Sequence, residues 1–294
     1  MGKILYNKDK WLDIANQKKY QDIRNKITSA FEDLVFEEGP HKYFLHEKEL
    51  PSVSMVVHKF QEPFDTDAVA IYTYNKYFND KSSKYYGKSV EDIKQMWTNM
   101  SDKACEIGTE RHEFGESCFW YMTGQLDKIL PQFKERLTKD GGFEARFPKE
   151  EAVIAFWNEI PRCMVPILCE NKVYSERLGY AGTFDILFYY DSSLNDTHCN
   201  NSDGFVIFDY KTNKKDLTLQ AGNKMLKYCL SNLTDCSLNI YKAQLSLYEL
   251  CLKSIGINVI GRRLIWLRNN GVYNKLQLES YADILEKFLL NPNY

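Results

Sequence analysis

Hydrophobic positions in the first third of the chain recur three and four residues apart or alternate with polar ones. Residues 10–36 carry apolar side chains at helical spacing, which predicts one or two amphipathic helices. Residues 41–57 alternate well enough to predict a short hairpin. These two elements form the predicted N-terminal part of the fold.

Two further helical stretches follow before the centre of the chain. Residues 71–97 mix tyrosines with lysines around a loop near Ser82 and Gly87, a pattern typical of a solvated helical surface. Tyrosines that alternate with lysines also suit a path for nucleic acid, because aromatic faces stack on bases while lysines meet phosphates. Residues 101–123 predict a helix with Ser101 as its N-cap.

The second half of the chain has the pattern of a β-sheet covered by helices. A helix is predicted over 150–160, ending before Pro161. Stretches rich in β-branched and aromatic residues then predict a set of strands, which are 165–176, 182–191, 204–211 and 258–268. A surface loop over 191–204 and a helix over 239–254 interrupt them. This order predicts an α/β (α+β) fold with a central mixed β-sheet flanked by helices.

Composition narrows the classes of protein that fit. The chain has 294 residues, long enough for one large domain or two smaller ones. Lys plus Arg total 38 against 40 for Asp plus Glu, so any binding of a polyanion depends on local clusters or on a bound metal. An N-terminal apolar leader and an apolar run near 18 residues are both missing from the sequence, which predicts a cytoplasmic protein that does not span a membrane.

Eight cysteines are present, and no two of them are separated by only two residues. Zinc ribbons and iron-sulfur clusters usually need such pairs, so neither is expected. The cysteines are best interpreted as reduced, small hydrophobic residues.

The stretch FVIFDYKTNKK, residues 205–215, carries the first candidate chemistry. Its apolar run predicts a buried strand, yet the run ends in Asp209 and Lys211, which project to the same face because they are two apart. Asp185 lies within the preceding predicted strand. If the two strands are neighbours, two carboxylates and one ammonium converge.

Two buried carboxylates repel each other unless a cation lies between them. Oxygen ligands suit Mg²⁺ or Mn²⁺, which can polarise a phosphate and activate water. Lys211 would then orient that water or neutralise the transition state, while Lys214 and Lys215 could grip a nucleic-acid backbone. The Asp-x-Lys pattern by itself is more typical of a structural ion pair than of a catalytic site.

Four short motifs in order decide between these interpretations. They are GTERH (108–112), CENKVYSERLGYAGTFD (169–185), FDYKT (208–212) and QLSLY (244–248). Together they resemble the RecB-type exonuclease branch of the PD-(D/E)XK nuclease superfamily. Within that branch the likeness is to phage-type exonucleases and the mitochondrial genome-maintenance exonuclease.

The resemblance implies a role for each matching residue. Asp185 and Asp209 would be metal ligands, Lys211 the catalytic lysine, and the carbonyl of Tyr210 would complete the metal shell. His112 would be a further metal ligand or a phosphate contact. The remaining implied residues support these ligands or contact DNA, and they are Glu116, Glu170, Gln244 and Tyr248. Glu116 shares a helix face with His112, and Gln244 and Tyr248 form the Gln-x3-Tyr pair.

The sequence also predicts an organisation, in which the resemblance covers the nuclease domain but neither the first fifty residues nor the Tyr/Lys-rich stretch. Residues 51–294 would form a restriction-endonuclease-like nuclease domain, with a Tyr/Lys-rich helical insert at about 65–100 and an accessory region at 1–50 that contains the predicted helices and hairpin. Some RecB-type relatives bind an iron-sulfur cluster through cysteines after the Gln-x3-Tyr helix. Here only Cys251 follows that helix, so no cluster is expected. Glu176 is interpreted as a surface residue.

The expected activity is a divalent-metal-dependent DNA exonuclease that acts on single strands or free ends, with recombination or replication proteins as possible partners. Three alternatives remain open: a metal-dependent endonuclease, a catalytically silent nucleic-acid-binding module of the same fold, and an enzyme in which Lys211 forms a Schiff base. If the Tyr/Lys-rich insert covers the site, linear single strands should be digested in preference to closed circles.

Overall fold

A computed structural model describes residues 3–6, 10–194, 202–217 and 224–291. The chain divides into two compact units, which are described separately: a large unit of residues 1–61 and 112–294, and a small unit of residues 62–111. The predicted insert at about 65–100 falls within the small unit. The predicted accessory region at 1–50 belongs to the large unit, where Trp11 and Tyr20 are part of the main core.

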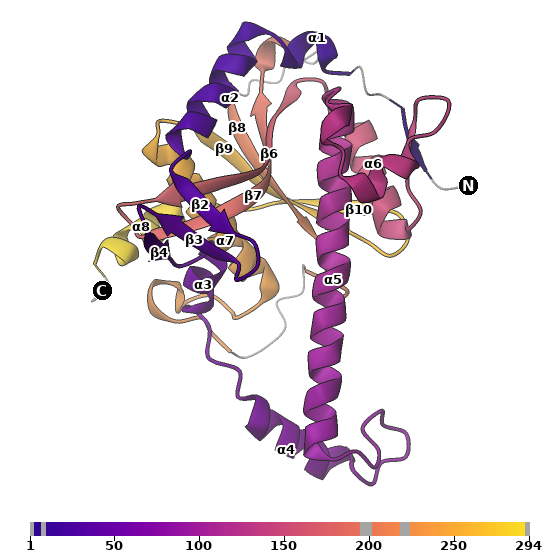
Figure 1. The fold of residues 1–294 in the computed structure, drawn as a ribbon. Coiled ribbons are helices and arrows are strands. Elements are labelled where there is room, and N and C mark those ends of the chain that lie inside the picture. The colour runs from indigo at the N-terminus through magenta and orange to yellow at the C-terminus, as the bar shows by residue number, and fades with distance from the viewer. Residues whose placement is uncertain (1–2, 7–9, 195–201, 218–223, 292–294) are drawn as a thin grey trace. The chain divides into compact units, whose positions relative to one another are not determined.

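A five-stranded mixed sheet forms the centre of the large unit, in the order β10-β9-β8-β7-β6 (Figure 1). Strands β6, β7 and β8 are antiparallel neighbours, β8 and β9 are parallel, and β9 and β10 are antiparallel. The predicted mixed α/β fold is therefore confirmed. The bounds of the strands are β6 Met164–Ser175, β7 Tyr180–Tyr190, β8 Gly204–Lys211, β9 Val259–Leu267 and β10 Tyr273–Gln277.

Helices α6 (Pro148–Glu159) and α7 (Ser237–Ser254) cover opposite faces of this sheet. The ring of Phe156 from α6 packs on Phe208 and Tyr210 of β8. On the other face, the ammonium of Lys211 lies against the ring of Tyr241 from α7. Successive side chains of a strand point to opposite faces, so Asp209 and Lys211 face α7 while Tyr210 faces α6.

The remaining elements of the large unit surround the central sheet. A three-stranded sheet has the order β2-β3-β4, and β1 pairs with β5. Their bounds are β1 Ile4–Leu5, α1 Leu12–Ala15, α2 Lys18–Ala30, β2 Leu34–Glu37, β3 Lys42–Leu45, β4 Lys48–Leu50, α3 Val53–His58, β5 Phe143–Glu144 and α8 Ala282–Leu290. Short 3₁₀ turns cover Leu126–Lys128, Pro131–Arg136, Ser192–Leu194 and Tyr228–Leu230.

The small unit contains α4 (Thr66–Tyr77) and the part of α5 (Val90–Met122) up to residue 111; α5 continues into the large unit. Tyr85 packs on Tyr77 and Trp97, with ring centroids 5.9 and 6.4 Å apart, so part of the Tyr/Lys-rich segment forms this unit's own core. Tyr72 and Tyr86 are exposed. In the described part of the chain, no helix combines the length and the apolar character needed to cross a membrane.

Two predicted boundaries in the N-terminal region are wrong. The predicted helical region 10–36 ends earlier, because residues 34–37 form strand β2, with Leu34 buried and Val35 exposed. The predicted hairpin over 41–57 stops at β4, and its last residues form helix α3. The hydroxyl of Ser52 caps α3 by accepting from Met55 N at 3.1 Å, and the valines at 53, 56 and 57 share one buried face.

The predicted N-cap of the helix over 101–123 is also wrong. Helix α5 starts at Val90, and Ser101 lies inside it. The hydroxyl of Ser89 accepts from Asp92 N at 3.1 Å, while the carboxylate of Asp92 accepts from Ser89 N at 3.0 Å. This reciprocal pair is a capping box. The stronger signal for the start of the helix is therefore Ser89, twelve residues before Ser101.

Other sequence assignments agree with the structure. The helices predicted over 150–160 and 239–254 and the four predicted strands are present with small shifts at their ends. Glu176 is exposed, as expected. Part of the predicted loop over 191–204, with Cys199, lies outside the described residues.

Candidate metal centre

Asp185 and Asp209 lie where the ladder between β7 and β8 ends. The last paired residues are Ile186 and Phe208, so the two aspartates occupy the next position along both strands. Asp185 Oδ2 accepts a hydrogen bond from the backbone N–H of Tyr210 at 2.6 Å. A side-chain contact thus replaces the next rung of the ladder, and both carboxylates are held at the same end of the sheet.

Glu170 brings a third carboxylate to this place from β6. Its neighbours Cys169 and Asn171 pair with Ile186 and Phe184, which puts Glu170 opposite Asp185. Glu170 has φ of 47°, in the left-handed region that residues with a Cβ seldom adopt. Backbone strain of this kind occurs preferentially at functional sites.

His112 reaches the three carboxylates from α5. Its Nδ1 lies 3.1 Å from Asp185 Oδ2. One turn further along the helix, Gly115 faces the ring of Tyr210, and a Cβ at this position would lie 2.4 Å from Cε2 of that ring. The glycine therefore allows α5 to approach β8 closely enough for the imidazole to reach the site.

Lys211 supplies an ammonium on the α7 side of the same cluster. Its Nζ lies 2.5 Å from Asp209 Oδ2 and 4.5 Å from the ring centroid of Tyr241. The hydroxyl of Tyr241 donates to Asn213 Oδ1 at 2.9 Å, which fixes the ring against the lysine. The sequence analysis missed Tyr241, although it lies three residues before Gln244 on the same helix.

The electrostatics of this cluster favour added positive charge. Burial and the nearby Asp185 raise the pKa of Asp209 to about 6, and burial with Asp185 also raises the pKa of Glu170. Burial lowers the pKa of His112, but the carboxylate of Asp185 outweighs burial and raises that pKa to about 9. The pKa of Lys211 is likewise raised by Asp209 and Asp185 despite burial.

The donor atoms fit a divalent cation. One nitrogen of His112 and one oxygen each of Glu170 and Asp185 all lie within 4.8 Å of one another. Asp209 is not in this set of three. Its Oδ2 is buried and, despite the ion pair with Lys211, makes no directed hydrogen bond with a described residue. The carboxylate oxygens of this set suit Mn²⁺ and Mg²⁺.

The other residues singled out in the sequence occupy different positions. Glu116 Oε1 accepts a hydrogen bond from the indole of Trp120 at 3.1 Å, and its role beside His112 stays a prediction. The side chain of Tyr210 is buried and its hydroxyl accepts from the indole of Trp157 at 3.1 Å, while its N–H donates to Asp185; the carbonyl of Tyr210 as a metal ligand stays a prediction. Lys214 and Lys215 are exposed beyond the end of β8.

Helix α7 presents Gln244 and Tyr248 toward the sheet. Their side chains meet at 3.4 Å between Nε2 and the hydroxyl, as expected for residues four apart. Gly182 of β7 faces Tyr248, and a Cβ there would lie 2.8 Å from Cε1 of the tyrosine ring. The close approach of β7 and α7 therefore requires a glycine at this point.

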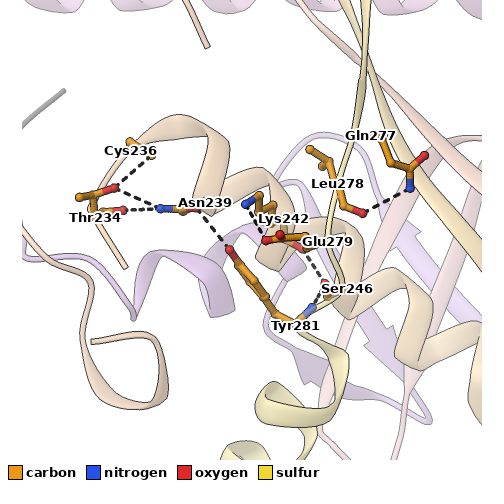
Figure 2. Close-up of polar contacts among 9 residues, drawn as sticks. All are labelled: Thr234, Cys236, Asn239, Lys242, Ser246, Gln277, Leu278, Glu279 and Tyr281. Atoms are coloured by element: carbon orange, nitrogen blue, oxygen red, sulfur yellow. Dashed lines mark hydrogen bonds and ion pairs between the residues drawn. The ribbon is translucent and has the colours of Figure 1, made fainter. Parts of the chain in front are cut away.

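A polar network holds α7 in place (Figure 2). Lys242 pairs with Glu279 at 3.0 Å, and the hydroxyl of Ser246 accepts from Tyr281 N at 2.8 Å. The hydroxyl of Tyr281 in turn donates to Asn239 Oδ1 at 3.3 Å. These contacts fix the rotation of α7 and therefore the direction of the side chains that it turns toward β8.

Two clefts adjoin the candidate metal centre. One, of about 610 Å³, is lined by Glu170 together with side chains of the β2–β3 hairpin, α5 and β7. The other, of about 410 Å³, is lined by Lys211, Tyr241 and Gln244 together with residues of α3. Groups from both sides of the cluster are thus accessible to a ligand.

The sequence was also compared with known proteins. It matches no family model, and no curated protein is significantly similar to it.

Proposed function

We propose that this chain is a divalent-metal-dependent deoxyribonuclease that hydrolyses phosphodiester bonds from strand ends. The observation that carries the proposal is the convergence of Glu170, Asp185 and Asp209 from three neighbouring strands, with His112 and Lys211 beside them. Their chemistry is that of a cation site next to a fixed ammonium. The PD-(D/E)XK resemblance of the sequence supports the same function.

Mg²⁺ or Mn²⁺ would be held by Asp185, Glu170 and His112, with Asp209 completing the acidic cluster. When bound, such an ion polarises a phosphate and lowers the pKa of water. The ammonium of Lys211, directed by Asp209 and the ring of Tyr241, is positioned to stabilise negative charge on the reacting phosphate. Lys214 and Lys215 would contact the phosphates of the bound DNA strand.

Two rival functions fit the site less well. A Schiff-base lysine requires a neutral amine, whereas the carboxylates of Asp209 and Asp185 raise the pKa of Lys211 and keep it charged. A silent nucleic-acid-binding module does not need buried, mutually repelling carboxylates, since these disfavour a polyanion unless a cation is present.

The test is incubation of the purified chain with end-labelled single- and double-stranded DNA in Mg²⁺, Mn²⁺ or EDTA. Cleavage with either metal and none with EDTA supports the proposal. Cleavage that persists in EDTA, or binding without cleavage in both metals, overturns it. An Asp209→Asn variant removes the anionic charge at nearly constant shape and controls for a contaminating nuclease.

A second substrate pair separates exonuclease from endonuclease action. Linear and covalently closed circular single strands of the same sequence should differ strongly in rate if the enzyme needs an end. Cleavage should also fall as salt rises, because lysine–phosphate contacts release counterions. Equal rates on the two substrates would favour the endonuclease and leave the metal chemistry intact.

A further inference from the structure

Three aromatic rings lie together at the tip of the β2–β3 hairpin. Phe36 of β2 stands opposite Tyr43 of β3, and their ring centroids are 4.7 Å apart. The ring of His41, in the turn between the strands, lies 4.9 Å from Phe36 and 6.3 Å from Tyr43. We refer to Phe36, His41 and Tyr43 as the hairpin platform.

The hairpin platform opens onto the candidate metal centre. Its three residues and Glu170 line the same cleft of about 610 Å³. The hydroxyl of Tyr43 lies 3.0 Å from Thr183 Oγ1, which ties the hairpin to β7 two residues before Asp185. The platform is therefore a wall of fixed position beside the cluster of carboxylates.

The charges around this cleft determine which chemical group it can accept. Besides Glu170, the cleft is lined by Glu38, Glu113 and Glu116, and these carboxylates repel phosphate. Tyr43 is buried, so the rings that a ligand can reach are those of Phe36 and His41, and their apolar faces suit an uncharged, planar partner. The basic residue of the lining, Lys172, has its ammonium over the ring of Phe36, 5.7 Å from the ring centroid.

We propose that the hairpin platform stacks a nucleobase of the strand whose phosphate is held at the metal centre. This inference rests on the proposed nuclease function and adds a subsite to it. The acidic lining keeps the backbone out of the cleft, so the base enters while the phosphate stays beside the metal and Lys172. Stacking does not read sequence, because every base has a π-face.

Two substitutions remove the rings with little effect on the hairpin. Phe36→Leu keeps an apolar side chain against the small core that contains Leu34 and Leu50. His41→Asn suits φ of 53°, since asparagine tolerates the left-handed region. The matched control is Val35→Ala, because Val35 lies on β2 beside Phe36, is 57% exposed and points to the opposite face.

The experiment measures binding of a fluorescein-labelled single strand in Mn²⁺, so that the metal centre is loaded, and the strand carries phosphorothioate linkages that resist cleavage. A thymidine strand is compared with a strand of equal length built from abasic residues. The wild type and Val35→Ala should bind the thymidine strand roughly tenfold more tightly than the abasic one. The double variant Phe36→Leu/His41→Asn should bind both strands equally.

The outcomes distinguish the inference from the function on which it rests. If the wild type binds both strands equally, or if the double variant still discriminates, stacking on the platform is wrong while metal-dependent cleavage stands. If the wild type neither binds nor cleaves DNA, both proposals fail. His41→Asn alone changes an exposed turn residue, so it reports on stacking even if Phe36→Leu lowers stability.

Discussion

Asp191, which follows β7, and Asp209, on the neighbouring strand β8, are both 2% exposed, yet their surroundings differ. Asp191, just after β7, accepts hydrogen bonds from Lys19 Nζ at 2.5 Å, Tyr20 hydroxyl at 2.6 Å and Ser193 hydroxyl at 2.5 Å. Burial raises the pKa of Asp191, but these donors outweigh burial and lower that pKa to about 2. The donors around Asp191 therefore compensate its charge within the fold, which is the behaviour of a structural carboxylate.

Asp209 shows the opposite behaviour at the same depth. Its ion pair with Lys211 does not offset burial and the repulsion of Asp185, and its pKa rises to about 6. Burial alone therefore does not identify a functional acid. The difference lies in whether the fold supplies enough donors, and at Asp209 a cation from outside the chain would supply the missing charge.

Removing a carboxylate from the candidate centre should have the largest effect on activity. Asp185→Ala and Asp209→Ala should each abolish metal-dependent cleavage, because each removes an anionic group that the cation needs. The measurement is the initial rate on end-labelled DNA in Mg²⁺. Asp191→Asn is the matched control and should keep the wild-type rate. Unchanged rates for Asp185→Ala and Asp209→Ala would show that these aspartates, like Asp191, have no role in cleavage.

Lys211→Ala should reduce the rate by about 10²-fold, the usual effect of losing a preorganised electrostatic group. Metal affinity, followed by calorimetry with Mn²⁺, should change little because an ammonium is no ligand. Lys253→Ala, at an exposed ion pair near the end of α7, controls for loss of a surface charge. Loss of the fold in Lys211→Ala would instead mean that Asp209 and Lys211 form a structural ion pair.

His112→Ala should reduce cleavage roughly tenfold, with partial rescue by higher Mn²⁺, since loss of an outer or additional ligand costs about 10–100-fold in metal affinity or activity. The rate is measured as Mn²⁺ is titrated. Wild-type rates at limiting metal would place His112 outside the metal shell and leave it as a partner of Asp185 alone.

Asp191→Asn should affect stability and leave cleavage intact. We expect a loss of about 3 kcal/mol in the free energy of unfolding at neutral pH, from weakened charge-assisted hydrogen bonds. Because the pKa of Asp191 is lowered to about 2 on folding, its contribution is present above about pH 4 and is lost as pH falls through about 2. Urea unfolding across this range should therefore show the variant and the wild type converging in acid. A constant difference would contradict the assignment.

Much of the sheet could be predicted because its sequence signals are local. The runs in β6 to β9 are short, rich in β-branched and aromatic residues and bounded by turn residues, a combination that is typical of buried strands. The N-terminal errors have local causes as well. At residues 52–57 the spacing of three valines and the Ser52 cap outweighed β-propensity, and at Ser89 a capping box began a helix earlier than expected.

The candidate site was only partly predictable. Asp185, Asp209 and Lys211 follow from strand periodicity, but Glu170 was expected only in a supporting role, and its carboxylate lies within the closest donor set. The hairpin platform was not foreseen, because Phe36 was assigned to a helix. Glu116 was expected beside His112 from helical spacing, and that role stays a prediction, while the indole of Trp120 on the same helix donates to its carboxylate.

The sequence by itself determined which side chains share a face of one element. Asp209 and Lys211 are two apart on a strand, and Gln244 and Tyr248 are four apart on a helix, so backbone geometry sets both pairs. Only the tertiary structure decided which elements meet: the antiparallel register puts Glu170 opposite Asp185, and Gly115 lets α5 bring in His112. Those contacts join segments distant in sequence, and they form only when burial of the shared core offsets the entropy of closing the chain between them.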